Sequence, residues 1–208
     1  MNRNRARLGL SAAASAAALF TALPSHAQSF YSSGKVSVAI ERAFGVHYAH
    51  NDIDPPGAPH ISSSATTLGF GWYGALSPLH WSRAAVDGFI IDRLSLGGSL
   101  AFFTQSGDAN GDGVLFSPRV GYAIPLSSVF TFWPRGGFTF LKLDNAYINN
   151  GSLFGLSAEA MFVAQPKPNW GILFGPTFDF GFVGDNGNDI SWSHIAIGFP
   201  SVGLMATF

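Results

Sequence analysis

Bulky apolar residues alternate with small or polar residues along most of the chain after residue 34. The clearest example is "NWGILFGPTFDFGFV" (169–183), in which Trp, Ile and Phe occupy one parity and mainly Gly, Thr and Asp occupy the other. A period of two residues is typical of a β-strand with one face in an apolar environment. The pattern predicts eight such strands, over residues 34–48, 82–91, 94–106, 113–124, 128–142, 152–165, 169–183 and 190–208.

The distribution of side-chain size and charge between the two faces favours a membrane environment. A soluble sheet directs its bulky residues toward a shared core and its charges toward water. Here the face that carries the small residues is rich in glycine, and charged residues make up only 11% of the chain. A face of small residues fits a narrow lumen, and the aromatic face then contacts lipid. Closing the sheet into a barrel also pairs the backbone groups at every strand edge. We therefore predict an all-β, closed antiparallel transmembrane up-and-down β-barrel, with a soluble lipocalin-like barrel as the alternative.

The connections between the predicted strands alternate in length. The short ones are 90–93, 124–128 and 165–169, and the long polar ones are 104–113, 142–152 and 183–191. Short periplasmic turns and long outer loops are typical of outer-membrane barrels, so both termini are expected in the periplasm. The stretch 64–74 also alternates, and we interpret it as an extension of the first hairpin above the membrane, joined to the next span by "ALSPLHW" (75–81). A barrel of ten strands is the alternative.

The N-terminal 27 residues predict export. Three arginines precede an apolar run from Leu8 to Leu23, and "SHA" ends at Ala27. This is the layout of a secretory signal peptide, and the run is shorter than the ~20 residues of a membrane-spanning helix. We predict a signal peptide at 1–27 and a barrel domain at 28–208, located in the outer membrane of a Gram-negative-type bacterium.

The charge and cysteine content narrow the function classes. Without the three signal arginines the chain has eight basic and twelve acidic residues, a net charge of −4. Nothing in this balance indicates the basic surface that nucleic-acid binding requires. There is no cysteine, so no disulfide framework exists.

Several of these segments resemble the small outer-membrane barrel family. They are the signal peptide, the terminal Phe208, "AVDGFIIDRLSLGGSLAFF" (85–103) and "TFWPRGGFTF" (131–140). The family comprises eight-stranded relatives of the outer-membrane protein A transmembrane domain and the opacity-type proteins. The resemblance implies that the barrel assembly machinery reads the last strand through Phe208. It implies no catalytic residues.

Charged residues on the small-residue parity predict a polar network inside the lumen. They are Arg83, Asp87, Arg119, Arg135, Glu159 and Asp179, with Glu41 on the first strand. Four of them, Arg119, Arg135, Glu159 and Asp179, come from four successive strands, whose side chains lie within reach of one another. An unpaired charge in a narrow lumen is costly, whereas paired charges are tolerated. We predict that Arg119 and Arg135 pair with Glu159 and Asp179 near mid-height, the alternative being separate charges solvated in a wet lumen.

Two weaker patterns concern metals. "DANGDG" places Asp108, Asn110 and Asp112 at alternate positions before a glycine, as in the opening of a calcium loop. The twelfth position, which should be Glu, is Arg119, so a turn stabilised by Asp and Asn is the alternative. The acidic outer loops also suggest divalent cations that bridge them to lipopolysaccharide phosphates. No other cofactor is predicted.

Histidine positions raise the question of catalysis or zinc. In "SWSH" (191–194) Ser191 and Ser193 are near His194, but no spacing identifies the third group that would orient a catalytic base. The histidines of the first loop region, at 47, 50, 60 and 80, lack the spacing of zinc ligands. We expect these to be solvated loop residues.

The size of the barrel bounds its function. Eight strands enclose about the volume that their own side chains fill, so a wide pore is not expected. We predict a non-enzymatic integral outer-membrane protein with an envelope-structural or surface-interaction role. Its predicted partners are membrane lipid, lipopolysaccharide and the barrel assembly machinery. The alternatives are a narrow porin-like channel for small or apolar solutes and an enzyme at the outer rim. No motif indicates a specific ligand or an oligomeric state.

Overall fold

The computed structural model describes residues 30–54, 59–70, 77–105, 111–145, 151–185 and 191–208, nearly all of them in strands. The strands are β1 (Val36–Asp54), β2 (Ile61–Phe70), β3 (Arg83–Ile91), β4 (Leu94–Gln105), β5 (Gly111–Tyr122), β6 (Ile124–Pro125), β7 (Phe130–Asn145), β8 (Gly151–Lys167), β9 (Trp170–Asp185) and β10 (Ser191–Thr207). One short 3-10 helix, η1 (Pro78–His80), precedes β3. Within the described residues no helix is long and apolar enough to cross a bilayer. The predicted signal peptide lies outside these residues.

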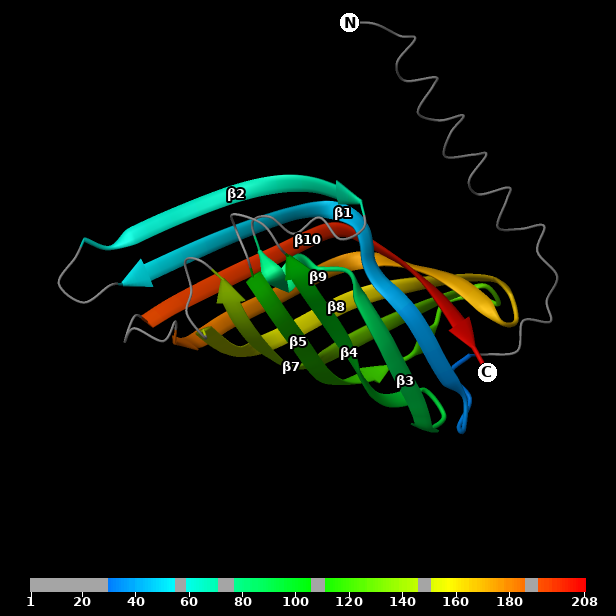
Figure 1. The fold of residues 1–208 in the computed structure, drawn as a ribbon. Helices are drawn as coiled ribbons and strands as arrows, with labels where there is room; N and C mark the ends of the chain where they lie inside the picture. Colours follow the sequence, from blue (N-terminus) through cyan, green and yellow to red (C-terminus); the bar gives the residue numbers. More distant parts are fainter. Residues whose placement is uncertain (1–29, 55–58, 71–76, 106–110, 146–150, 186–190) are drawn as a thin grey trace, which may run out of the picture.

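The strands close into an antiparallel barrel (Figure 1). Eight strands form the ring in the order β1, β3, β4, β5, β7, β8, β9 and β10, and β10 pairs with β1 to close it. Two further strands join the sheet: β2 pairs with β1, and the two-residue β6 pairs with β7. The predicted fold class is confirmed, and the ten strands of the sheet include only eight in the ring.

The first described residues lie at the same end of the barrel as the short turns. The backbone N–H of Arg93, in the β3–β4 turn, donates to the Tyr31 carbonyl, and Gly34 N–H donates to the Phe89 carbonyl. At the other chain end, Phe208 and Val36 exchange backbone hydrogen bonds in both directions. Both ends of the described chain are therefore fixed to the wall where the short turns lie, as predicted for the periplasmic side.

The wall is built differently in its outer half, because β1 is longer than β3. Residues Val36 to Glu41 of β1 pair with β3, whereas Phe44 to Ile53 pair with β2. The strand predicted at 34–48 therefore continues to Asp54, and β2 extends the first hairpin as expected, but from Ile61. On the other side, β4 pairs with β3 only as far as Leu100. Among the described residues, β2 and the outer part of β4 do not pair with each other, and we call this interruption of the wall the seam.

Side-chain parity confirms which face is outside. Large apolar residues project outward, including Phe102 at 65% exposure and Leu204 at 59%. A continuous apolar exterior of this kind requires lipid rather than water. Aromatic pairs on neighbouring strands add to it, with ring centroids 5.1 Å apart for Phe132–Phe162 and 4.9 Å for Phe140–Phe154. Such cross-strand pairs stabilise strand pairing and register.

The lumen is filled by three layers of side chains. Near the end with the short turns Phe30 packs edge-to-face against Phe89 and Trp133, at centroid distances of 5.5 and 5.4 Å. A second apolar cluster lies toward the outer end and includes Leu79, Trp81, Leu115, Leu141, Leu143 and Leu153. Along β7 the charged Arg135 stands between Trp133 of the first cluster and Leu141 of the second. Charged residues therefore form the middle layer.

Residues 77–82, which we call the plug segment, correct the expectation for this part of the chain. The sequence suggested a connection above the membrane, but Ser77, Leu79, His80, Trp81 and Ser82 are all buried. The lumen offers this segment both apolar contacts and hydrogen-bond partners, a combination that neither water nor lipid provides. The expectation of solvated histidines is also wrong for His80 and His47, which are buried with ring centroids 4.4 Å apart.

Candidate functional site

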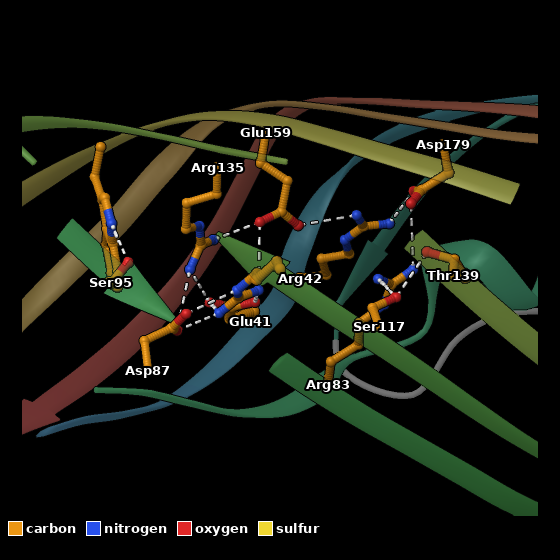
Figure 2. A network of polar contacts seen from close by, with 12 residues as sticks. Glu41, Arg42, Arg83, Asp87, Ser95, Ser117, Arg135, Thr139, Glu159 and Asp179 are labelled. Carbon is orange, nitrogen blue, oxygen red and sulfur yellow. Dashed lines mark hydrogen bonds and ion pairs between the residues drawn. The ribbon is translucent and has the colours of Figure 1, made fainter. Parts of the chain in front are cut away.

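The middle layer of the lumen contains eight charged side chains, which we call the charge cluster (Figure 2). Its members are Glu41, Arg42, Arg83, Asp87, Arg119, Arg135, Glu159 and Asp179, each at most 6% exposed. Four arginines face four carboxylates, so their formal charges cancel. Six strands around the ring supply these residues, and only a closed barrel brings the residues together.

Arg119 and Arg135 connect one half of the cluster. Arg119 contacts Glu41 at 2.6 Å and Asp87 at 2.5 Å, donating through both terminal nitrogens. Arg135 Nη1 donates to the same Glu41 at 2.5 Å, and its Nη2 lies 2.7 Å from Glu159. Glu41 is thus shared between two guanidinium groups, and Glu159 also contacts Arg42 and Arg119, at 3.0 and 3.4 Å. Sharing of this kind compensates the desolvation of a buried charge better than a single contact does.

Arg42 and Arg83 form the other half, around Asp179. Arg42 donates to Asp179 at 2.5 Å and to Glu159 at 3.0 Å, while Arg83 lies 3.7 Å from Asp179. Both arginines also donate to the backbone carbonyl of Leu79, at 2.5 and 2.6 Å. The charge cluster therefore holds the plug segment in the lumen.

The structure brings together all six predicted lumen charges and Glu41. The predicted Arg119–Glu159 and Arg135–Glu159 pairs are present, at 3.4 and 2.7 Å. Asp179, however, pairs with Arg42 and Arg83 rather than with Arg119 or Arg135. The partner of Asp179 was misjudged because Arg42 was missing from the prediction.

Arg42 was missed because strict alternation would direct it toward lipid. Glu41 and Arg42 are consecutive, yet both are buried inside the barrel. The backbone makes this possible at a β-bulge: the β1–β10 register shifts between Ile40 and Phe44, and Arg42 has a φ of 55°. A bulge of this kind redirects a side chain while the strand continues. An arginine on a lipid-facing parity was the signal that could have revealed it, since charge there is costly.

Small residues leave room for the cluster. A Cβ on Gly121 would lie 2.6 Å from Trp133 Nε1 and 2.8 Å from Arg135 Cγ. The Arg135 guanidinium lies over the Trp133 ring, 4.6 Å from its centre, and Trp133 Nε1 donates to Ser95 at 3.1 Å. A remaining cavity of about 10 Å³ is lined by members of the cluster and by Ser117 and Ser157, among others. That is about the space that one water molecule needs.

The metal predictions involve residues that the structure covers only in part. Asp108 and Asn110 lie outside the described residues, while Asp112 projects outward on β5, opposite Asp144 of β7. Within the described residues no three His, Cys, Asp or Glu side chains are arranged to hold a metal ion. Calcium binding in this loop stays a prediction.

The hairpin formed by β1 and β2 carries a small exposed polar group. Asp52 lies 3.1 Å from His50 and 3.2 Å from His60. The pKa of Asp52 is below its ordinary value, mainly because of a hydrogen bond from Ser62. The predicted solvated state of the loop histidines agrees with the exposure of His60.

Two further predicted residues have clear positions. Phe208, the proposed assembly signal, is 73% exposed at the β10 end of the wall. His194 projects into the lumen, where a serine of the plug segment, Ser77, contacts its Nε2 at 2.5 Å. The sequence had paired His194 with Ser191 and Ser193 instead.

A closed antiparallel sheet with an apolar exterior and a polar, filled lumen defines a transmembrane β-barrel. No family model and no curated protein matches the chain. Among solved structures it is similar to Neisserial surface protein A, with 10% identity, a TM-score of 0.48 and coverage of 84% of this chain and 99% of the other. It is also similar to the N-terminal barrel domain of Pseudomonas aeruginosa OprF, with 10% identity, a TM-score of 0.46 and coverage of 85% and 98%. A third similar structure is Ail, the attachment invasion locus protein of Yersinia pestis, with 13% identity, a TM-score of 0.39 and coverage of 85% and 99%.

Proposed function

We propose that the protein is a sealed outer-membrane barrel with an envelope-structural or surface-interaction role. The observation that carries this proposal is the charge cluster, packed between two apolar clusters across the lumen. An ion or solute that crosses the barrel has to displace all three layers. The proposal therefore favours a structural barrel over a narrow channel.

The energetic argument concerns the middle layer. Removing one partner of a buried ion pair costs about 3–5 kcal/mol, because the other charge is left without compensation. Opening a path through the cluster separates several such pairs at once, since Glu41 and Glu159 each contact more than one arginine. The balanced charge of the cluster also gives no preference for cations or anions. A conducting state of this lumen is therefore strongly disfavoured.

Conductance in planar lipid bilayers tests the proposal. Refolded mature protein is expected to give no conductance steps above the bare membrane. Removal of a cluster charge in Arg135→Ala should either destabilise the barrel or introduce a small leak. Arg93→Asn is the matched control, because Arg93 lies in an exposed turn at a φ of 72° that Asn tolerates. Reproducible steps from the unaltered protein would instead favour the narrow channel.

The outer face supports lipopolysaccharide as the lipid partner. A groove of about 470 Å³ on this face is lined mainly by aromatic and aliphatic residues, with Lys142 among them. Directly beyond it, Asp112 and Asp144 face each other on β5 and β7. In this proposal a lipid phosphate binds Lys142, and a divalent cation bridges the acidic outer loops to a second phosphate.

Lipopolysaccharide retention in lipid nanodiscs tests this partner. One basic residue near a charged membrane surface contributes about 1 kcal/mol, or about fivefold in affinity. Lys142→Ala should therefore weaken retention about fivefold. Lys167→Ala is the control, because Lys167 lies at the short-turn end of β8, and this variant should retain the lipid normally. Equal retention by both variants would remove Lys142 from the site.

A further inference from the structure

Three side chains from distant parts of the chain meet inside the outer half of the barrel. The Ser77 hydroxyl of the plug segment lies 2.5 Å from Nε2 of His194 on β10. Nδ1 of the same ring hydrogen-bonds to Oδ1 of Asn51 on β1. Asn51 and His194 face each other directly in the β1–β10 register, so the wall itself sets their separation. Ser77 and His194 are 2% and 1% exposed.

The chemistry of Asn51 determines the direction of these hydrogen bonds. An amide oxygen can only accept, so the hydrogen of neutral His194 is on Nδ1. Nε2 then carries the lone pair and accepts the Ser77 O–H. This is the tautomer in which a histidine can remove a proton from serine. The arrangement thus has a hydroxyl nucleophile, an adjacent base and a third group that orients the base.

We propose that Ser77, His194 and Asn51 form a hydrolytic site for lipid acyl esters. Ser77 Oγ attacks the ester carbonyl carbon and forms a C–O bond, while its proton moves to His194 Nε2. The carbonyl oxygen becomes an oxyanion, which collapses as the ester C–O bond breaks. The leaving alkoxide takes the proton from Nε2. Water then attacks the acyl-serine with His194 again as base, releasing a carboxylic acid and restoring the Ser77 hydroxyl.

The charge cluster positions the nucleophile. Two residues beyond Ser77, the Leu79 carbonyl accepts from Arg42 and Arg83 at 2.5 and 2.6 Å. The Leu79 N–H donates to Ser77 Oγ at 3.2 Å and so helps to fix the orientation of the hydroxyl. Ser77 belongs to the plug segment, which is not a strand, so pairing within the barrel wall does not fix its position.

The surroundings favour an apolar acyl group. Leu79 and Trp81, which follow Ser77 in the plug segment, belong to the outer apolar cluster, against which Ile53 also packs. The seam lies on the same side of the wall as the plug segment, since that segment directly precedes β3. Among the described residues no strand pairing fixes this part of the wall, so it can separate at lower cost than the paired remainder. A lipid acyl chain has to enter through the seam to reach Ser77, which is buried in the closed barrel.

Covalent labelling of the full mature protein in detergent micelles tests the site directly. A fluorophosphonate probe forms a bond between Ser77 Oγ and phosphorus as fluoride leaves, and peptide mass spectrometry locates the label. We expect labelling at Ser77 and hydrolysis of p-nitrophenyl esters, faster for long acyl chains than for acetate. His194→Ala should lower both rates at least 100-fold, as loss of a general base does. Ser77→Ala should abolish labelling. Ser99→Ala removes another buried lumen hydroxyl as the matched control and should react normally.

Asn51 is a positioning residue, and its variants distinguish catalysis from packing. Asn51→Asp keeps an oxygen that accepts from Nδ1 and should retain most of the labelling rate, whereas Asn51→Ala should lose at least tenfold. Heat-modifiable gel mobility verifies that each variant is a folded barrel. A purely structural role for the three residues predicts altered mobility and no labelling in any variant. Absence of Ser77 labelling in the folded, unaltered protein overturns the proposal, whatever the conductance experiments give.

Discussion

Arg135→Met is the most informative perturbation of the charge cluster. Methionine approximates the length of the arginine stem but removes the charge. Glu41 then loses a donor at 2.5 Å and Glu159 loses a contact at 2.7 Å, leaving three arginines against four carboxylates. Because the stranded carboxylates stay buried, we expect the free energy of unfolding to fall by about 3–5 kcal/mol.

A second substitution tests whether that loss comes from charge imbalance. Glu41→Gln in the Arg135→Met background restores equal numbers of opposite charges with little change in volume. The double variant should therefore lose less than the sum of the two single losses, with a coupling energy of about 1–3 kcal/mol. Urea unfolding in lipid vesicles, followed by loss of the folded band on unboiled gels, measures each value from the transition midpoint. Trp fluorescence is a poorer probe, since the Arg135 side chain covers the Trp133 ring.

Two outcomes would refute this reasoning. A loss below about 1 kcal/mol in Arg135→Met would mean that water enters the lumen and solvates the carboxylates. Strict additivity of Arg135→Met and Glu41→Gln would mean that the residues do not interact, despite their 2.5 Å contact. Arg93→Asn, outside the lumen, should leave the midpoint unchanged in either case.

Three other predictions follow from the same structure. Leu79→Ala should cost about 2–5 kcal/mol of stability, measured by the same urea transition, because Leu79 is 1% exposed in the outer apolar cluster. Phe208→Ala should lower the amount of assembled barrel in outer-membrane fractions far more than it lowers export, and equal assembly would show that Phe208 is not an assembly signal. Chelation of divalent cations should raise protease cleavage in the outer loops if a cation orders them near Asp112, and unchanged cleavage would exclude such a cation.

The β-bulge at Glu41 and Arg42 illustrates why pattern and structure differ. Alternation along the strands predicted seven of the eight charges of the charge cluster and missed only Arg42. Alternation can be read from the sequence because each strand imposes it on its own side chains. A bulge is a local exception, and its position depends on the neighbouring strand β10 as well as on β1. Its consequence is large: Arg42 supplies the 2.5 Å partner of Asp179 and helps to hold the plug segment.

The sequence by itself determined the class of protein. Period-two alternation, a glycine-rich face and an aromatic face specify a closed barrel and its inside, because a strand must match each face to its surroundings. Connection lengths determined which end carries the short turns. These features depend on residues close together in the chain, so a single sequence is sufficient to read them.

Only the tertiary structure decided what fills the outer half of the lumen. Residues 77–82 have no period that predicts burial, and their position depends on Arg42 and Arg83 reaching the same carbonyl, that of Leu79. Likewise, Asn51, Ser77 and His194 are separated by at least 26 positions in the chain and meet because β1 and β10 pair around the plug segment. Contacts of this kind arise from closure of the whole barrel, which brings together side chains that no local spacing relates.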